Sequence, residues 1–331
     1  MKFLQIGLGS MGKRRIRNLK VLGFKDIIGY DLKKERRKEC ELSYGIRTVD
    51  NISKEVVLGV DAIIMSTPPD KHLEYMWLAI QQSMPAFVEA SVLRNGLEEV
   101  NEAAKKKKVL IAPSCTFKFH PSIKVIKNIT RKNLYGKITN FVYHIGQYLP
   151  DWHPWENIKD FYVSKKEVGG CREMVPFELT WILDVFGFPE EVFAFYGKTL
   201  DLGIDIDDVY SINMKFKNYF GNMLVDVVSR WANRWFILNM EKAQVIWNWN
   251  ERVVKVYESV SGRWIYYYEP KEKAYEGYNV NIIEKMYVEE LKTFISALKG
   301  ENIFPSSLDE DIRVLKLLET LEKSNKGVKF E

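Results

Sequence analysis

A glycine-rich turn directly after the first apolar run constrains the fold of this chain more than any other feature. The run 3–6 leads into Gly7-Leu8-Gly9-Ser10-Met11-Gly12, where an amphipathic stretch with helical spacing begins. Glycines at this spacing allow a tight strand-to-helix turn, a close approach of a bound group to the backbone, and close packing of helix on strand. Because the N–H groups at the start of such a helix attract anions, we predict a phosphate-binding turn here.

The first third of the chain alternates short apolar runs with amphipathic stretches. This alternation is typical of a parallel sheet that helices cover on both faces. We predict strands at 3–6, 27–30, 62–66, 86–88 and 109–111, and helices at 11–22, 34–44, 71–82 and 96–106. The sequence therefore predicts an α/β domain of Rossmann type, a doubly wound parallel sheet, over residues 1–120.

Beyond residue 120 the segments alternate between apolar and polar residues and are rich in aromatic side chains, which is typical of hairpin-like antiparallel sheet. We predict strands at 138–148, 191–196, 208–216, 221–229, 235–240 and 244–249, and helical segments at 122–130, 175–186, 280–299 and 307–325. The sequence thus predicts a second, α+β domain over residues 121–331. Its C-terminal helix could pack back on the first domain.

Charge and length exclude one large class of partner. A chain of 331 residues favours two domains. Its 49 Lys and Arg residues are interleaved with 44 Asp and Glu residues, for a formal net charge of +5. The densest basic runs, 13–15 and 105–108, are predicted to form solvated helix surface. We therefore expect no nucleic-acid partner.

The cysteines and the apolar runs point to the cellular compartment. Cys40, Cys115 and Cys171 are far apart and lack the paired spacing of a metal site, so we expect no metal and a reduced, cytoplasmic protein. No uninterrupted apolar run has membrane length, and the N-terminal apolar run leads straight into the glycine turn rather than into a cleavage site. We expect neither export nor a membrane partner.

An acidic residue at the end of the second predicted strand indicates which ligand the glycine turn binds. Asp31 follows the glycine turn by about 20 residues, where a carboxylate can accept hydrogen bonds from the adenosine ribose of a dinucleotide. The turn and this carboxylate together predict bound NAD. A carboxylate here repels a ribose 2′-phosphate, but the nearby Lys33, Lys34, Arg36 and Arg37 could receive that phosphate, so NADP stays open.

Three further motifs follow the glycine turn: Ser66-Thr67-Pro68-Pro69 with His72, Phe87-Val88-Glu89, and Phe117-Lys118-Phe119-His120-Pro121. With the glycine turn they resemble the Gfo/Idh/MocA family of oxidoreductases, and the resemblance runs from end to end of the chain. It implies that the Thr-Pro-Pro turn and the segment after Val88 line the cofactor. The residues assigned to the cofactor are Gly7, Gly9, Ser10, Met11, Gly12, Asp31, Ser66, Thr67, Pro68, Pro69, His72, Glu89 and Ala90.

The resemblance also carries expectations for the second domain. It implies a large, mostly antiparallel open sheet that often forms the dimer surface, so we expect a homodimer or homotetramer. The typical substrates of the family are sugars, sugar phosphates, nucleotide-linked sugars and inositols. We therefore expect a sugar-type small molecule as the substrate of this chain.

The chain departs from the family pattern where the chemistry takes place. Glu89-Ala90-Ser91 stands in place of Glu-Lys-Pro, so the lysine that reaches nicotinamide and substrate is missing. The family places an aspartate and a histidine on a helix after a Gly-Gly pair. Here Gly169-Gly170 is followed at those positions by Met174 and Glu178, and Glu173 takes the first position if the register slips by one. The usual proton-transfer residues are therefore replaced.

We predict Glu178, Lys118 and His153 as catalytic residues. A carboxylate performs acid–base work when burial raises its pKa, so Glu178 could replace the histidine. The alternatives are that Glu178 pairs with Arg172 or hydrogen-bonds a substrate hydroxyl. Lys118 stands where the family usually has an arginine and could supply the ammonium that Ala90 lacks, although it could also be a surface lysine.

The segment 144–155 is dense in aromatic and proton-transferring side chains and predicts a wall of the substrate pocket. Aromatic rings offer apolar faces to sugar C–H groups, and His153 could orient or protonate a substrate. The alternative is an aromatic satellite core under a long loop, which is nearly as favourable an interpretation for Trp155. The predicted substrate-binding residues are Lys118, Tyr148, Trp152, His153, Arg172 and Glu178.

These residues predict an NAD(P)-dependent oxidoreductase that transfers a hydride at a carbinol or carbonyl carbon of a sugar-type substrate. The missing lysine and histidine leave two alternatives. One is a cofactor-binding sensor or regulatory protein that has lost the chemistry. The other is an enzyme that keeps NAD tightly bound and produces no net redox change.

Overall fold

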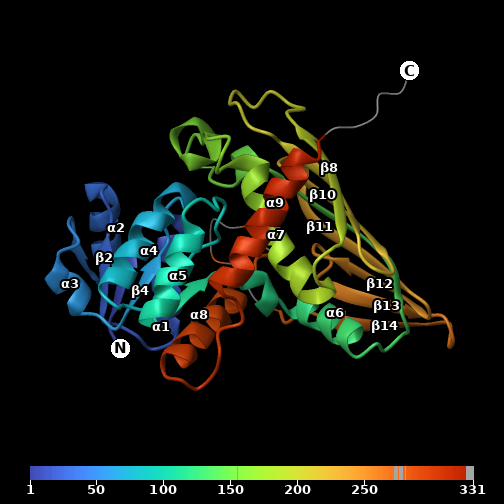
Figure 1. Ribbon diagram of the computed structural model, residues 1–331, viewed down its shortest axis with the longest axis horizontal. Helices are drawn as coiled ribbons and strands as arrows, with labels where there is room; N and C mark the ends of the chain where they lie inside the picture. Colours follow the sequence, from blue (N-terminus) through green and yellow to red (C-terminus); the bar gives the residue numbers. More distant parts are fainter. Residues whose placement is uncertain (155, 272–274, 276–278, 280, 326–331) are drawn as a thin grey trace. The chain divides into compact units, whose positions relative to one another are not determined.

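The computed structural model describes residues 1–154, 156–271, 275, 279 and 281–325 (Figure 1). The chain divides into two compact units. The first unit consists of Met1–Thr116 and Lys285–Leu315, and the second of Phe117–Glu284 and Lys316–Glu331. The division after residue 116 lies close to the predicted boundary at 120. The first unit also takes in 285–315, which the sequence had placed in the second domain.

The first unit contains a six-stranded sheet in the order β3-β2-β1-β4-β5-β6, and all of its neighbouring strands are parallel. Its strands are β1 Phe3–Ile6, β2 Ile27–Tyr30, β3 Arg47–Val49, β4 Ala62–Met65, β5 Ala86–Val88 and β6 Ile111–Pro113. Strand β3 was not predicted, because it is a short, partly exposed edge strand without an apolar run. The predicted doubly wound parallel sheet is confirmed.

Helices accompany these strands in alternation, as the amphipathic stretches predict. They are α1 Ser10–Val21, α2 Lys34–Tyr44, α3 Lys54–Leu58, α4 His72–Gln81 and α5 Leu97–Lys107, with the short 3-10 helix η1 Pro69–Lys71 before α4. From the C-terminal part of the chain come α8 Glu284–Leu298 and the first half of α9 Leu308–Lys323. The central strands β1 and β4 are fully buried, which explains why they read as continuous apolar runs.

The second unit contains an eight-stranded sheet in the order β14-β13-β12-β11-β7-β10-β9-β8. Neighbouring strands are antiparallel except for β10 and β7, which run parallel. Its strands are β7 Ile138–Tyr148, β8 Glu191–Gly197, β9 Val209–Lys215, β10 Phe220–Asp226, β11 Val228–Met240, β12 Ala243–Asn248, β13 Val253–Glu258 and β14 Arg263–Tyr268. The expected large, mostly antiparallel sheet is confirmed, with β13 and β14 in addition to the predicted strands.

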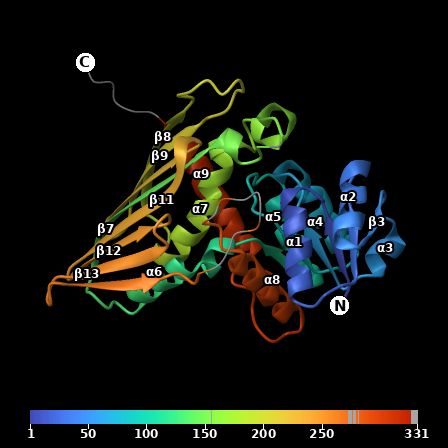
Figure 2. The same cartoon turned by 180° about the vertical axis from the view of Figure 1, so that it is seen from behind.

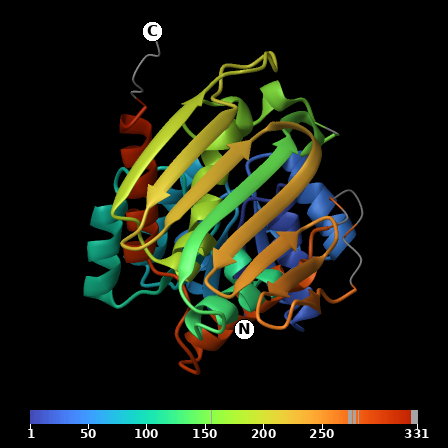
Figure 3. The same ribbon diagram turned by 90° about the vertical axis from the view of Figure 1, so that its right-hand side faces the viewer.

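One face of this sheet carries helices and the other is open. Helices α6 Pro121–Arg131 and α7 Gly170–Phe186 cover one face (Figures 1 and 2), and Figure 3 views the sheet from the opposite side, with the strands in front of these helices. Residues of β7 alternate accordingly: Phe141, Tyr143 and Ile145 are buried, whereas Val142 is exposed. Helix α7 begins five residues earlier than predicted and contains Pro176 in its interior.

Short 3-10 helices complete the second unit. They are η2 Thr116–Phe119, whose first residue still belongs to the first unit, and η3 Leu149–Asp151, η4 Ile158–Asp160 and η5 Tyr162–Ser164, which lie between β7 and α7. Within the described part of the chain, none of the helices combines the length and apolar character that a membrane span requires.

Candidate cofactor and substrate sites

The glycine turn between β1 and α1 requires glycine at two positions, Gly7 and Gly12. Gly7 has a φ of +86°, and a Cβ atom on it would lie 2.4 Å from the carbonyl oxygen of Ser66 at the end of β4. A Cβ atom on Gly12 would lie 1.9 Å from the carbonyl oxygen of Gly7. Gly9, in contrast, meets only the flexible guanidinium of Arg36, at 3.5 Å. The turn is therefore tightly packed on the sheet side and leaves room at Gly9.

The first turn of α1 offers backbone donors to an anion. Its N-cap residue is Gly9, which has no side-chain oxygen to bond the first N–H groups, and the first turn carries no acidic residue. N–H groups at a helix start need an acceptor, and the helix dipole favours a negative one. The turn lies where the sheet order reverses between β1 and β4, which is where doubly wound folds bind dinucleotides. These residues fit the pyrophosphate of NAD.

Asp31 holds the glycine turn in place in addition to its predicted role toward the ribose. Its Oδ2 accepts a hydrogen bond from the backbone N–H of Leu8 (2.9 Å), and its Oδ1 accepts one from the backbone N–H of Lys33 (2.8 Å). Arg36 Nη1 lies 3.6 Å from Asp31 Oδ2. A carboxylate, which favours the ribose of NAD, and a guanidinium, which favours the 2′-phosphate of NADP, therefore lie together after β2. The structure is compatible with either cofactor.

His72 supports the turn after β4. Its Nε2 lies 2.9 Å from the carbonyl oxygen of Thr67, which can only accept, so this nitrogen carries the hydrogen. Burial lowers the pKa of His72, and the imidazole is accordingly neutral at pH 7. Ser66 Oγ donates a hydrogen bond to Glu89 Oε1 (3.2 Å), which links the ends of β4 and β5. These contacts order the segment that the resemblance assigns to the cofactor.

A buried arginine lies behind the glycine turn. Arg15 of α1 donates from Nε and Nη2 to the two oxygens of Glu89, at 2.6 and 2.9 Å, and its Nη1 lies 2.8 Å from Glu290 Oε2. The guanidinium carbon is 4.5 Å from the centre of the Phe87 ring. The prediction that the basic run 13–15 is solvated is wrong for Arg14 and Arg15, which are buried.

Glu290 of α8 completes this cluster within the first unit. It accepts hydrogen bonds from Ser114 Oγ (3.0 Å), the Cys115 backbone N–H (2.6 Å) and Thr116 Oγ1 (2.7 Å). Helix α8 is thereby joined to α1 and to the end of β6. Helical spacing places Arg15 on the same face as the buried Gly12 and Leu19, and this signal could have revealed its burial.

Glu178 lies fully buried in the middle of α7, and four donors engage its two oxygens. Oε2 accepts from Tyr143 Oη (2.7 Å) and Trp181 Nε1 (2.9 Å), and Oε1 accepts from Arg234 Nε (3.0 Å) and Nη2 (2.8 Å). Arg234, on β11, was not singled out from the sequence. These contacts are typical of a carboxylate that holds the fold together, and its role in catalysis stays a prediction.

Arg172 does not pair with Glu178, which corrects that alternative. Its Nε and Nη2 donate to Glu322 Oε1 (2.6 Å) and Oε2 (3.2 Å), and its Nη1 donates to the carbonyl oxygen of Glu167 (2.5 Å). Tyr210 Oη also donates to Glu322 Oε1, at 3.2 Å. Arg172 thus joins α7 to the last turns of α9 within the second unit.

The segment around Lys118 is buried. Lys118 in η2 is only 7% exposed, so the alternative of a surface lysine is wrong. His120 caps the start of α6 and stacks on Phe117 at 5.5 Å. Burial lowers the pKa of His120 to about 3, and the positive charges of Arg234 and Arg252 act in the same direction. His120 is therefore neutral at physiological pH.

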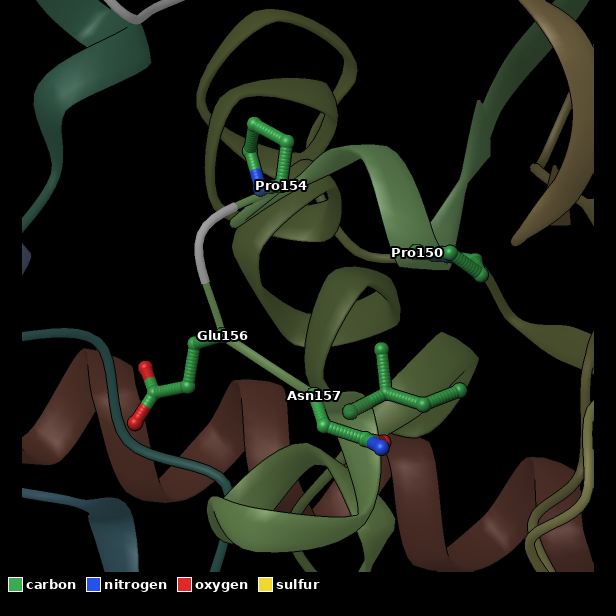
Figure 4. Close-up of a pocket in the computed structure, with 5 residues that line it drawn as sticks. Pro150, Pro154, Glu156 and Asn157 are labelled. Atoms are coloured by element: carbon green, nitrogen blue, oxygen red, sulfur yellow. The ribbon is translucent and has the colours of Figure 1, made fainter.

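The segment that follows β7 forms a hollow within the second unit. This open hollow has a volume of about 400 Å³ and is lined by Pro150, Pro154, Glu156, Asn157 and Ile158. Figure 4 shows the two proline rings, the Glu156 carboxylate and the Asn157 amide around this space. Among the described residues, prolines, polar side chains and Ile158 line it.

The predicted aromatic residues lie beside this hollow in the chain. Tyr148 lies under the guanidinium of Arg230, 3.8 Å from the ring centre to Cζ. His153 stacks on Phe161 at 5.0 Å, and its Nδ1 lies 3.6 Å from Glu156 Oε2. Trp152 is partly buried. Trp155 lies outside the described residues.

Glu173 takes the position of the family aspartate if the register slips by one residue from Met174. Its environment differs from that of Glu178. It lies in the first turn of α7, and its Oε1 accepts a hydrogen bond from Tyr162 Oη in η5 (2.6 Å). Its Oε2 is buried and has no hydrogen-bond partner among the described residues. Burial raises the pKa of Glu173 to about 7, although the hydrogen bond from Tyr162 opposes this rise.

The whole chain has a fold that is known from solved structures. An oxidoreductase from Agrobacterium radiobacter in complex with NAD⁺, L-tartaric acid and magnesium is 13% identical with a TM-score of 0.85, over 98% of this chain and 96% of that chain. Levoglucosan dehydrogenase in complex with NADH and levoglucosan is 14% identical with a TM-score of 0.81, over 98% of this chain and 97% of that chain. The WlbA dehydrogenase from Bordetella pertussis in complex with NADH and UDP-GlcNAcA is 15% identical with a TM-score of 0.78, over 98% of this chain and 96% of that chain.

At these identities the likeness establishes the fold. No curated protein matches the chain in sequence. A family model, GFO_IDH_MocA, described as an oxidoreductase family with an NAD-binding Rossmann fold, matches residues 1–114. This match covers the glycine turn, Asp31, the turn after β4 and Glu89, and it confirms the predicted resemblance and NAD as the cofactor. Over residues 1–114 the chain is therefore similar to the Gfo/Idh/MocA family of NAD-binding oxidoreductases.

Proposed function

We propose that this protein is an NAD(P)-dependent oxidoreductase that acts on a CH–OH group of a sugar, sugar phosphate or nucleotide-linked sugar. The observation that carries the proposal is the glycine turn, whose backbone geometry and uncapped helix start fit a pyrophosphate. The family match over residues 1–114 supports it. Two proteins of similar fold, levoglucosan dehydrogenase and WlbA, were solved with sugar-type ligands, which favours this substrate class.

When bound, NAD⁺ supplies the oxidant by accepting a hydride from the substrate carbon. The residues of the chain have to hold the cofactor and the substrate and to manage the hydroxyl proton. The glycine turn and Asp31 would hold the pyrophosphate and the adenosine ribose. Lys118 and His153 remain our candidates for contacts to the substrate hydroxyls, with the ammonium suited to an anionic or hydroxylated group. Glu178 accepts hydrogen bonds from Arg234, and its role in catalysis remains a prediction.

The first experiment measures cofactor binding and turnover separately. Titration calorimetry with NAD⁺ and with NADP⁺ measures binding, and the nicotinamide absorbance at about 340 nm follows turnover of a panel of sugars, sugar phosphates and nucleotide sugars. We expect binding of at least one cofactor and a steady absorbance change with at least one panel member. Binding without any absorbance change would favour the sensor, or the enzyme without net redox change.

A matched pair of variants tests where the cofactor binds. Gly9→Val should abolish cofactor binding, because its side chain would occupy the space that the turn leaves for the phosphates, while only the flexible Arg36 lies nearby. Gly197→Val is the control, since Gly197 lies at the end of β8 in the second unit and no atom lies within 4 Å of the position that its Cβ would occupy. Equal binding by both variants would contradict the assignment.

We also propose that the open face of the eight-stranded sheet joins two copies of the chain. Leu224 on β10 and Trp235 on β11 flank His144 of β7 in register, and both side chains are exposed. Val142 on β7 is exposed on the same face, which Figure 3 shows uncovered by helices. Exposed apolar patches of this kind mark interfaces, and most oligomers are symmetric dimers or are built from them.

Leu224→Glu should convert the oligomer to a monomer, because a charge buried without a partner at a self-complementary face is costly. Sedimentation velocity measures the mass. Leu42→Glu, on the exposed side of α2 in the first unit, should leave the mass unchanged. A wild-type chain that sediments as a monomer, or a Leu224→Glu variant that keeps the wild-type mass, would disprove this interface.

A further inference from the structure

A histidine and a carboxylate pair on the open face of the eight-stranded sheet, the face that Figure 3 views. His144 of β7 stands in register between Leu224 of β10 and Trp235 of β11, and its Nε2 lies 2.7 Å from Asp226 Oδ2. Because an ionised carboxylate only accepts hydrogen bonds, Nε2 carries a hydrogen and the proton that titrates belongs to Nδ1. The His144 side chain is 29% exposed, so a partner that covers this face also covers the pair.

A glycine on β7 makes room for the carboxylate of this pair. A Cβ atom on Gly146 would lie 2.3 Å from Ser229 Oγ and 2.9 Å from Asp226 Oδ2. The register of β11 against β7 shifts between Val228 and Asn233, and this irregularity takes Ser229 out of the strand pairing. Asp226 and Ser229 therefore meet across the β7 backbone, and a side chain at position 146 would displace them.

Asp226 stays ionised at physiological pH. Its Oδ1 accepts from the backbone N–H groups of Val228 (3.1 Å) and Ser229 (2.7 Å), and its Oδ2 accepts from Ser229 Oγ (3.0 Å) as well as from His144. Burial alone would raise the pKa of Asp226, but these hydrogen bonds outweigh burial and lower it. The pair is therefore negative when the imidazole is neutral and has no net charge when the imidazole is protonated.

The other titratable and charged groups around His144 are engaged elsewhere. Tyr148, farther along β7, lies under the guanidinium of Arg230 of β11, with 3.8 Å from the ring centre to Cζ. Arg234, also on β11, is almost fully buried and donates to Glu178. In the described part of the chain, the charge that contacts the imidazole is the carboxylate of the pair.

We propose that protonation of His144 stabilises the dimer formed through the open face, so that the dimer weakens as the pH rises. This inference rests on the interface proposed above. A second copy removes water from the pair, and a buried carboxylate without a counterion is costly, whereas an adjacent imidazolium compensates it. The dimer therefore favours the protonated imidazole. By linkage, association takes up protons, so the stabilisation is present at low pH and is lost as the pH rises.

Sedimentation of the full-length protein at a series of pH values tests this regulation. The dissociation constant of the wild-type dimer should rise about ten- to hundredfold between about pH 5.5 and about pH 9, the change that a tenfold preference for the protonated imidazole in one or both copies gives. His144→Gln should lose this dependence and associate weakly at every pH, because the amide donates to Asp226 but carries no charge.

Two further variants make the test specific. Asp226→Asn should reverse the trend, because a protonated His144 then becomes an uncompensated charge in the interface while the amide oxygen still accepts from the backbone. His153→Gln is the matched control: this histidine lies in the same unit, with Nδ1 3.6 Å from Glu156 Oε2, and the variant should keep the pH dependence of the wild type.

The linked protons are also measurable in the wild-type protein, without any substitution. Calorimetric dilution of the dimer at about pH 7 in two buffers with different heats of ionisation reports the protons released when the copies separate. We expect a larger heat in one buffer than in the other, equivalent to a release of up to about one proton per chain. Equal heats in the two buffers would overturn the inference.

The outcomes separate this inference from the proposed interface. A wild-type dissociation constant that stays within about twofold across the pH series would overturn the role of His144 while the interface stands. A pH dependence that His144→Gln retains would do the same. A wild-type chain that sediments as a monomer at every pH would reject the interface, and this inference with it. The oxidoreductase function is measured independently, by cofactor binding and turnover.

Discussion

Replacing Arg15 by methionine should lower the free energy of unfolding by about 3–5 kcal/mol, the usual cost of removing one partner from a buried ion pair. Arg15 is fully buried and neutralises both Glu89 and Glu290, so the substitution leaves two carboxylates without their counterion. Because Glu290 lies on α8, the attachment of that helix to the rest of the first unit should weaken as well. Urea unfolding followed by circular dichroism measures the change.

Two further variants make the Arg15 prediction specific. Glu290→Gln should also destabilise the protein, since Glu290 accepts from Ser114, Cys115 and Thr116 as well as pairing with Arg15. Lys38→Met, on the exposed side of α2, should change the free energy of unfolding by no more than about 0.5 kcal/mol. A loss below about 1 kcal/mol in Arg15→Met would show that the cluster does not hold the fold.

Glu178→Gln should destabilise the second unit by a similar amount, about 3–5 kcal/mol. The amide cannot neutralise Arg234, which is almost fully buried, and its NH₂ group would face at least one of the donors that now approach the two carboxylate oxygens. Helix α7 and strand β11 are joined through this pair, so their packing should loosen. The same urea titration measures the effect.

The Glu178 variant also separates a structural from a catalytic role. Glu191→Gln, at an exposed ion pair with Lys215, is the control and should cost no more than about 1 kcal/mol. Full wild-type stability of Glu178→Gln combined with a large loss of kcat would contradict our assignment and restore Glu178 as the acid–base residue predicted from the sequence.

The cofactor domain was largely predictable because its signals are local. The glycine turn, the strand before it and the helix after it span only the first 21 residues, and the buried parallel strands appear as apolar runs in the sequence. Strand β3 was missed because its three partly exposed residues form no apolar run. Strands β13 and β14 were also missed, although both are rich in apolar and aromatic residues.

The substrate side was predictable only as a list of candidates. His153 and Tyr148 were chosen by residue type, and Lys118 by its place in a family motif. The contacts of His153 with Glu156 and of Tyr148 with Arg230, and the burial of Lys118, follow from packing. Glu173 and Glu178 lie five positions apart on α7, and both side chains end in a carboxyl group. Four donors hold Glu178, whereas Glu173 keeps a buried oxygen that has no hydrogen-bond partner in the described part of the chain. This difference follows from packing rather than from the residue type.

The sequence by itself predicted the NAD-binding Rossmann domain and the resemblance to the Gfo/Idh/MocA family, because both depend on motifs of residues that are neighbours in the chain. Only the tertiary structure decided the partners of the buried charges. Arg15 meets Glu290, and Arg234 meets Glu178, across long stretches of chain. The physical reason is that the pairing of a buried charge depends on which elements pack together, and that packing is a property of the whole core rather than of any local pattern.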